Sequence, residues 1–134
     1  MRVQRAEYPA LLTGHGSACR FFAPYFDIDN QLIEQLWVAH VDGANRCIHV
    51  ERHKGGPASV GIPVRMIVAE AARRGSAGIL LAHNHPSGDS RPSDADHRAT
   101  RKLARALEAI DLSLLDHLIF ADGQCSSMRR LGLL

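Results

Sequence analysis

Residues 78–86 read Gly78-Ile79-Leu80-Leu81-Ala82-His83-Asn84-His85-Pro86, an apolar run that ends in two histidines and a proline. A short apolar run without polar alternation is typical of a strand buried on both faces of a sheet. The histidines then follow at the carboxyl end of that strand, the edge where α/β proteins commonly bind ligands. The stretch therefore predicts a central strand with a functional site at its end.

The segments on either side predict the rest of the fold. Asp42-Gly43 is a hairpin signal, Pro63 is typical of a helix start, and Gly75 of a helix end. The expected elements are strands over 35–41 and 46–50, a helix over 63–74, a second helix over 94–110 and a strand over 114–120. This interleaving predicts an α/β fold with a central mixed sheet flanked by helices.

Residues 1–33 show no clear period but contain a dense aromatic cluster between Phe21 and Phe26, interrupted by Pro24. Two interpretations remain open: a short helix or cap packed on the core, and an exposed patch that binds a partner. We divide the chain into an N-terminal segment packed on the core, residues 1–33, and a domain formed by residues 34–134.

The composition is that of an ordinary soluble domain: 134 residues, 46% apolar and 22% charged. No apolar run is long enough to cross a bilayer and the N-terminus lacks a secretory signal, so we expect no membrane association and a cytoplasmic location. Cys19, Cys47 and Cys125 are odd in number and widely separated, which predicts free thiols in a reducing compartment rather than a zinc ribbon. A net charge of +2 neither requires nor excludes nucleic-acid binding.

The two histidines predict a metal site. His83 and His85 are two residues apart, so on an extended segment both imidazoles leave the same face of the backbone. Asp96, in the next element, can supply a third ligand. Two imidazole nitrogens and one carboxylate oxygen suit one tetrahedral Zn²⁺ per chain with an open fourth position, as in catalytic sites. Ser93-x-x-Asp96 also has the spacing of a helix capping box, and the two roles can coexist.

A hydrolytic site also needs a general base within hydrogen-bond reach of the reacting water. Glu70 and Glu108 fall within the expected helices, where they face solvent. Glu34 opens the first expected strand and Glu51 closes the second, and the strand period does not choose between them.

From Glu34 to its end, the sequence resembles the RadC family, whose JAB/MPN domain carries the JAMM motif. That motif is a glutamate followed far downstream by His-x-His-Pro, six residues and Ser-x-x-Asp. The matching residues are Glu34, His83-Asn84-His85-Pro86, Ser93 and Asp96, with further similarity at Asp116-His117 and Gly132-Leu133-Leu134. The resemblance implies a JAB/MPN-type fold, similar in architecture to cytidine deaminases.

The resemblance also implies roles for these residues. His83, His85 and Asp96 would bind zinc, Glu34 would act as general base and acid, and Ser93 would stabilise the oxyanion. The implied activity is JAMM-type hydrolysis of a peptide, isopeptide or other amide bond by metal-activated water, so a peptide or protein substrate is expected. Asp116 and His117 either orient a metal ligand through a hydrogen bond or form a structural polar pair.

Two departures from the family pattern affect these expectations. Longer RadC relatives carry an N-terminal region resembling helix-hairpin-helix units, and we expect a short form without it, so DNA binding through that region is not implied. The Gly-Thr usual after the second strand is Gly55-Gly56 here, which predicts a different loop beside the site.

Two other functions remain open. One is a non-catalytic DNA- or protein-interaction module linked to DNA repair, in which a basic helix face could contact phosphates. That face consists of Arg98, Arg101, Lys102 and Arg105. The other is cleavage of phosphodiesters, against which a single His-His-Asp centre argues, because carboxylate-rich sites with two metals are commoner for that chemistry.

Overall fold

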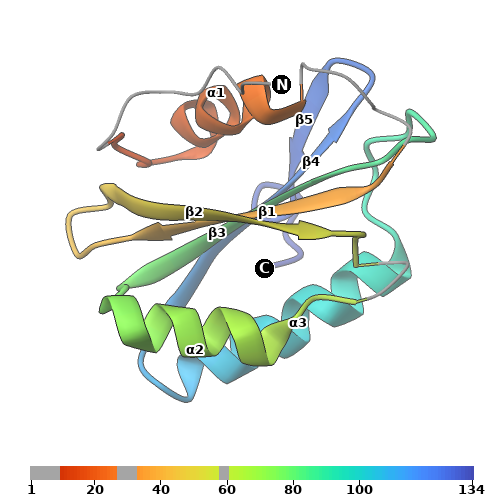
Figure 1. The fold of residues 1–134 in the computed structure, drawn as a ribbon. Coiled ribbons are helices and arrows are strands. Elements are labelled where there is room, and N and C mark those ends of the chain that lie inside the picture. The colour runs from red at the N-terminus through yellow and green to blue at the C-terminus, as the bar shows by residue number, and fades with distance from the viewer. Residues whose placement is uncertain (1–9, 27–32, 58–60) are drawn as a thin grey trace.

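The computed structural model describes residues 10–26, 33–57 and 61–134. Within these ranges the elements follow one another as labelled in Figure 1: α1 His15–Phe26, β1 Gln35–Val41, β2 Cys47–Lys54, α2 Val64–Arg74, β3 Gly78–Asn84, α3 Asp94–Glu108, β4 Ser113–Ala121 and β5 Gln124–Ser127. The predicted α/β class is confirmed.

The middle layer is a five-stranded mixed sheet in the order β2-β1-β3-β4-β5. β3 and β4 run parallel, and the other neighbouring strands run antiparallel. Parallel strands need a crossover connection, and here α3 supplies it. α2 and α3 cover one face of the sheet and α1 covers the other (Figure 1).

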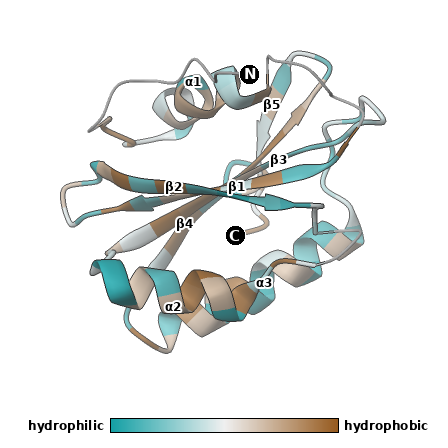
Figure 2. Ribbon diagram, in the orientation of Figure 1, coloured by the Kyte–Doolittle hydropathy of each residue, from teal (hydrophilic) through white to brown (hydrophobic). Residues whose placement is uncertain are grey.

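β3 is buried along its whole length, as predicted for the central strand. Its side chains alternate between the faces: Leu80 and Ala82 pack in the layer under α1, whereas Ile79 and Leu81 pack against α2 and α3. The strand continues to Asn84, so His83 lies inside the sheet. α2 packs its apolar side on this core, and brown and teal residues alternate along it in Figure 2.

The helices end where local backbone geometry stops them. Gly75 adopts a left-handed conformation at φ 65° after α2, and its N–H donates to the carbonyls of Ala71 and Ala72. α3 ends two residues earlier than predicted because Asp111 takes a positive φ of 63° and the N–H of Leu112 donates back to the carbonyl of Leu107.

Among the described helices, none combines the length and apolar character needed to cross a bilayer.

The main differences from the expected strands are a longer β2 and an additional strand, β5. β2 extends to Lys54 because its pairing with β1 continues as far as Gln35. β5 was not predicted: its residues are mostly polar, and it forms because it pairs with the end of β4. Asp122 and Gly123 join the two strands with positive φ angles of 49° and 77°, as tight hairpin turns require.

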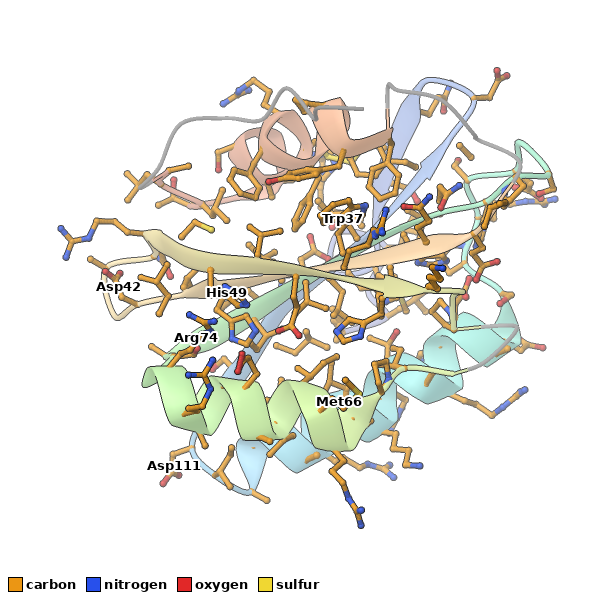
Figure 3. The ribbon with its side chains drawn as sticks, in the orientation of Figure 1. Trp37, Asp42, His49, Met66, Arg74 and Asp111 are labelled. Carbon is orange, nitrogen blue, oxygen red and sulfur yellow. A yellow bond between two sulfur atoms is a disulfide. The ribbon has the colours of Figure 1, made fainter. Side chains whose placement is uncertain are left out.

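The aromatic cluster lies on the inner side of α1. Phe21, Phe22, Tyr25 and Phe26 are all buried. Trp37 points from β1 toward this helix, with its ring centroid 4.2 Å from that of Tyr25 (Figure 3). The packed-helix interpretation is therefore right for the cluster, and the partner-binding patch is wrong. The rest of the N-terminal segment, residues 1–9 and 27–32, lies outside the described residues.

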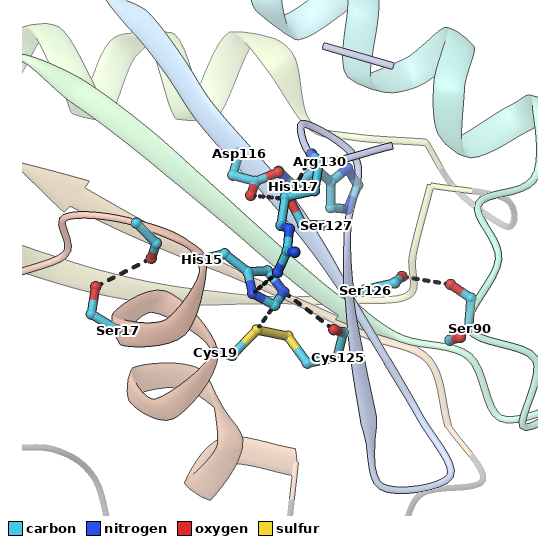
Figure 4. Close-up of a disulfide and its surroundings, with 11 residues drawn as sticks. His15, Ser17, Cys19, Ser90, Asp116, His117, Cys125, Ser126, Ser127 and Arg130 are labelled. Carbon is cyan, nitrogen blue, oxygen red and sulfur yellow. Dashed lines mark hydrogen bonds between the residues drawn. A yellow bond between two sulfur atoms is a disulfide. The ribbon is translucent and has the colours of Figure 1, made fainter. Parts of the chain in front are cut away.

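A disulfide between Cys19 and Cys125 joins α1 to β5 (Figure 4). The prediction of free thiols is wrong for these two cysteines, because folding brings residues 106 positions apart into contact. It is correct for Cys47, which is buried and forms no disulfide. The cysteine argument for a reducing compartment therefore fails. His15 lies beside the disulfide, but paired sulfurs offer no thiolate to a metal.

We expect the disulfide to stabilise the native state by about 2–4 kcal/mol, because it restricts the unfolded chain. Urea unfolding of the wild-type protein with and without dithiothreitol measures this difference. The Cys19→Ser/Cys125→Ser variant is the control. Its free energy of unfolding should match that of the reduced wild type and should be the same with and without dithiothreitol. Equal wild-type stability under both conditions would contradict the bond.

Candidate metal centre

The end of β3 and the start of α3 bring three polar side chains together. His83 projects from β3 and is fully buried, and His85 follows directly after the strand. The His85 backbone N–H still donates to the carbonyl of Phe120 in β4, which holds it against the sheet. Asp96, the third residue of α3, is also fully buried. The structure thus gathers all three predicted metal ligands.

Their ligand atoms are close enough to share one ion. The carboxylate of Asp96 lies 2.9 Å from Nε2 of His85 and 3.4 Å from Nε2 of His83. One nitrogen or oxygen from each residue lies within 4.8 Å of the others. This set of two imidazoles and one carboxylate matches the protein ligands of catalytic zinc sites.

Two buried atoms of this group support the fit of a cation. Nε2 of His83 and Oδ1 of Asp96 have no hydrogen-bond partner among the described residues. An unsatisfied buried polar atom costs on the order of 1–3 kcal/mol, so native proteins retain few of them. A metal ion coordinated by both atoms would remove that cost.

Asp96 caps α3 as well as facing the histidines. Its Oδ2 accepts from the backbone N–H of Ser93, and its own backbone N–H donates to Oγ of Ser93. The capping box is therefore present. Because the cap occupies Oδ2, Oδ1 stays available, and the capping and ligand interpretations of Asp96 are compatible.

The charges in this group are arranged to keep Asp96 ionised. Burial opposes ionisation, but the nearby ring of His83 and the hydrogen bonds from His85 and the Ser93 N–H hold the pKa of Asp96 well below its usual value. The same carboxylate, by accepting a hydrogen bond, raises the pKa of His85 above that of an ordinary histidine. The site therefore presents an ionised carboxylate, which attracts cations, and an imidazole whose Nε2 can be taken by a proton or by a metal ion.

Glu34 lies just before β1 and lines a cavity of about 510 Å³ together with His85 and Ser93. Its Oε1 is buried and accepts no hydrogen bond from the described residues. A Cβ at Gly56 would overlap the Glu34 carboxylate, so a larger residue there would make this side chain move. The Gly55-Gly56 departure thus leaves room for this side chain.

Glu51, the other glutamate that the strand period left open, has different neighbours. Its carboxylate accepts hydrogen bonds from the rings of His40 and His53. Burial raises its pKa, but the hydrogen bonds and charges of His40 and His53 together more than offset this and keep the pKa below its usual value. Glu51 does not line the cavity beside His85. Of the two candidates, Glu34 is the one that lines the cavity with His85.

Asp116 and His117 have separate roles. The carboxylate of Asp116 accepts hydrogen bonds from Ser127, shown in Figure 4, and from the backbone N–H of Arg129, so it serves the structure. The ring of His117 is buried and its Nε2 lies 2.7 Å from Nδ1 of His83. Burial holds the pKa of His117 well below its usual value, so this ring is neutral. The structural alternative therefore describes Asp116, whereas His117 contacts His83, as the first alternative requires.

Thr100 completes this arrangement and is absent from the sequence predictions. Its Oγ lies 2.7 Å from Nδ1 of His117 and donates to the Asp96 carbonyl at 2.6 Å. The sequence contains a signal for Thr100: in a helix, a residue four positions after Asp96 lies on the same face as Asp96.

We expect His85→Ala to abolish stable zinc binding, because it removes one of three ligands. Zinc content after loading and desalting measures this, with about one ion per wild-type chain. His97→Ala, on the same helix as Asp96 but outside the ligand group, is the matched control. Equal zinc content in His85→Ala and wild type would contradict the site.

The zinc affinity of the wild type should fall as the pH drops through the raised pKa of His85, because protons and zinc compete for Nε2.

Known proteins resemble this chain over most of its length. Residues 13–133 match the family model described as the RadC-like JAB domain. Curated relatives include UPF0758 proteins of Flavobacterium johnsoniae, 38% identical over 90 residues, Bordetella petrii, 38% over 120, and Cellvibrio japonicus, 36% over 114. The alignments cover 66%, 89% and 84% of this chain but 39%, 52% and 44% of those proteins, so the chain spans about half of their length or less. By the family model and by these identities, the chain belongs to the RadC family of JAB-domain proteins.

Proposed function

We propose that this chain is a zinc-dependent hydrolase of the JAMM type that cleaves a peptide, isopeptide or other amide bond. The observation that carries the proposal is the pair of buried, unpartnered atoms, Nε2 of His83 and Oδ1 of Asp96, beside His85 and a cavity that contains Glu34. A structural polar cluster would not leave these atoms without partners.

His83, His85 and Asp96 would hold the zinc. The bound ion would supply a Lewis acid that polarises the substrate carbonyl and makes a water molecule more acidic. The chain's own residues then handle the protons. Glu34, with Oε1 free of hydrogen bonds from the described residues, accepts a proton from the attacking water and delivers it to the leaving nitrogen.

Ser93 is positioned to support the same reaction. Its Oγ accepts the N–H of Asp96, and its hydroxyl proton has no acceptor among the described residues, so it is available to the substrate. The hydroxyl lines the cavity of Glu34 and His85, where it can donate to the developing oxyanion.

The space around His85 fits an elongated substrate. His85 and Pro86 line two cavities, one of about 510 Å³ with Glu34 and Ser93, and one of about 460 Å³ between α1 and the β4–β5 turn. A peptide lying across His85 can place groups in both. This favours a peptide or protein as the partner over a small amide.

The basic face of α3 supports a second candidate, a DNA- or protein-binding module of the RadC type. Its four side chains are all exposed, and they are Arg98, Arg101, Lys102 and Arg105. Such a stripe can contact phosphates, but it is also typical of a solvated helix.

We expect Glu34→Gln to retain zinc and to lose hydrolysis by about 10²–10⁴-fold in kcat, because the amide keeps the shape but cannot accept the proton. A fluorogenic peptide library with the zinc-loaded protein supplies the substrate. Glu108→Gln, exposed on α3, is the matched control and should keep wild-type turnover. Undiminished hydrolysis by Glu34→Gln would remove Glu34 as the base, and no hydrolysis of any library member by the wild type would count against the proposal.

Arg101→Ala/Arg105→Ala distinguishes the two candidates. Neither residue lines the cavities at His85, so zinc content and peptide hydrolysis should stay within about twofold of wild type. Fluorescence anisotropy with labelled DNA over a salt series provides the other measurement. Salt-dependent wild-type binding that this variant loses, together with no amide turnover, would favour the binding module.

A further inference from the structure

We infer that Thr100 and His117 are positioning residues that fix the tautomer of His83, so that Nδ1 carries the proton and Nε2 presents its lone pair to the metal. The importance of this arrangement for zinc rests on the proposed function. The tautomer itself is a property of the protein without metal.

The Thr100 hydroxyl sets the direction of the first hydrogen bond. It has one proton and two polar neighbours, the Asp96 carbonyl at 2.6 Å and Nδ1 of His117 at 2.7 Å. A carbonyl oxygen can only accept, so the proton of Thr100 goes to Asp96. The sulfur of Met128, at 3.7 Å, is a weaker and more distant acceptor. Oγ must then accept from His117, which places a proton on Nδ1 of His117.

The second hydrogen bond takes its direction from the first. A neutral imidazole with a proton on Nδ1 has an acceptor at Nε2. Nε2 of His117 lies 2.7 Å from Nδ1 of His83, so His83 must be the donor. The alternative, a doubly protonated His117, would bury a charge on a fully buried ring that forms no ion pair with a described carboxylate.

The third step reaches the metal centre. With its proton on Nδ1, a neutral His83 has a bare lone pair on Nε2, which faces Oδ1 of Asp96 at 3.4 Å. Two acceptors that face each other inside the protein favour a cation between them. The Thr100 hydroxyl also bonds the backbone of Asp96, so one side chain restrains both ligands.

The tautomer is measured first in the metal-free wild type, by long-range ¹H–¹⁵N spectra of ¹⁵N-histidine-labelled protein with His83→Gln for assignment. We expect His83 and His117 both to be protonated on Nδ1. A proton on Nε2 of His83 would overturn the inference. This measurement requires neither zinc nor a folded variant of Thr100 or His117.

Variants then test the effect on the metal. Thr100→Val keeps the shape but loses the acceptor, so it should lower zinc affinity in a chelator competition by about 10- to 100-fold and mix the His83 tautomers. Thr100→Ser restores the hydroxyl and should bind zinc within about threefold of wild type. Ser127→Ala removes a buried hydroxyl from the neighbouring Asp116 network and is the matched control for lost stability.

The outcomes separate this inference from the proposed function. Wild-type zinc affinity in a folded Thr100→Val protein would overturn the positioning role. The expected tautomers and affinities in a protein that hydrolyses no amide would support the positioning role of Thr100 and His117 and contradict the hydrolase proposal alone.

Discussion

The constraint on which the site depends is the close approach of two buried polar atoms that have no hydrogen-bond partner among the described residues. Nε2 of His83 and Oδ1 of Asp96 lie 3.4 Å apart without other partners among the described residues. Free side chains would rotate to find donors. Here His83 is fixed inside a strand buried on both faces, and Asp96 is fixed by the cap of α3. The surrounding structure therefore holds these atoms in an arrangement that is costly for the protein alone and that a cation between them would stabilise.

One supersecondary unit supplies nearly all of this arrangement. β3 carries His83 and leads directly to His85, α3 begins with Asp96 and carries Thr100 one turn later, and β4 returns with His117 on the face that α3 covers. Glu34 joins from outside the unit. Leu36 pairs with His83, so the residue two positions earlier reaches past the end of β3 toward the cavity of His85. The parallel β3–α3–β4 connection is thus the scaffold, and the antiparallel neighbour β1 adds the carboxylate.

The sequence predicts those parts of the structure that depend on local pattern. β3 follows from an apolar run, the end of α2 from Gly75, and the ligand group from spacing within about a dozen residues. The parts that it misses depend on distant pairing. β5 is a strand only because β4 lies beside it, and Cys19 finds Cys125 only after α1 packs across the sheet. The strand period alone did not choose between Glu34 and Glu51. The family resemblance named Glu34, and only the structure shows why Glu51 is unsuitable: β2 runs on to Lys54, and Glu51 bonds His40 and His53 away from the cavity of His85.

The bond between Cys19 and Cys125 also closes most of the described chain into one covalent ring. The exposed turn at residues 86–89 lies within that ring, between the histidines and Asp96. A protease that nicks this turn would place His83 and His85 on one fragment and Asp96 on the other. The two fragments would remain a single molecule, with the ligands still tethered, until a reductant separated them.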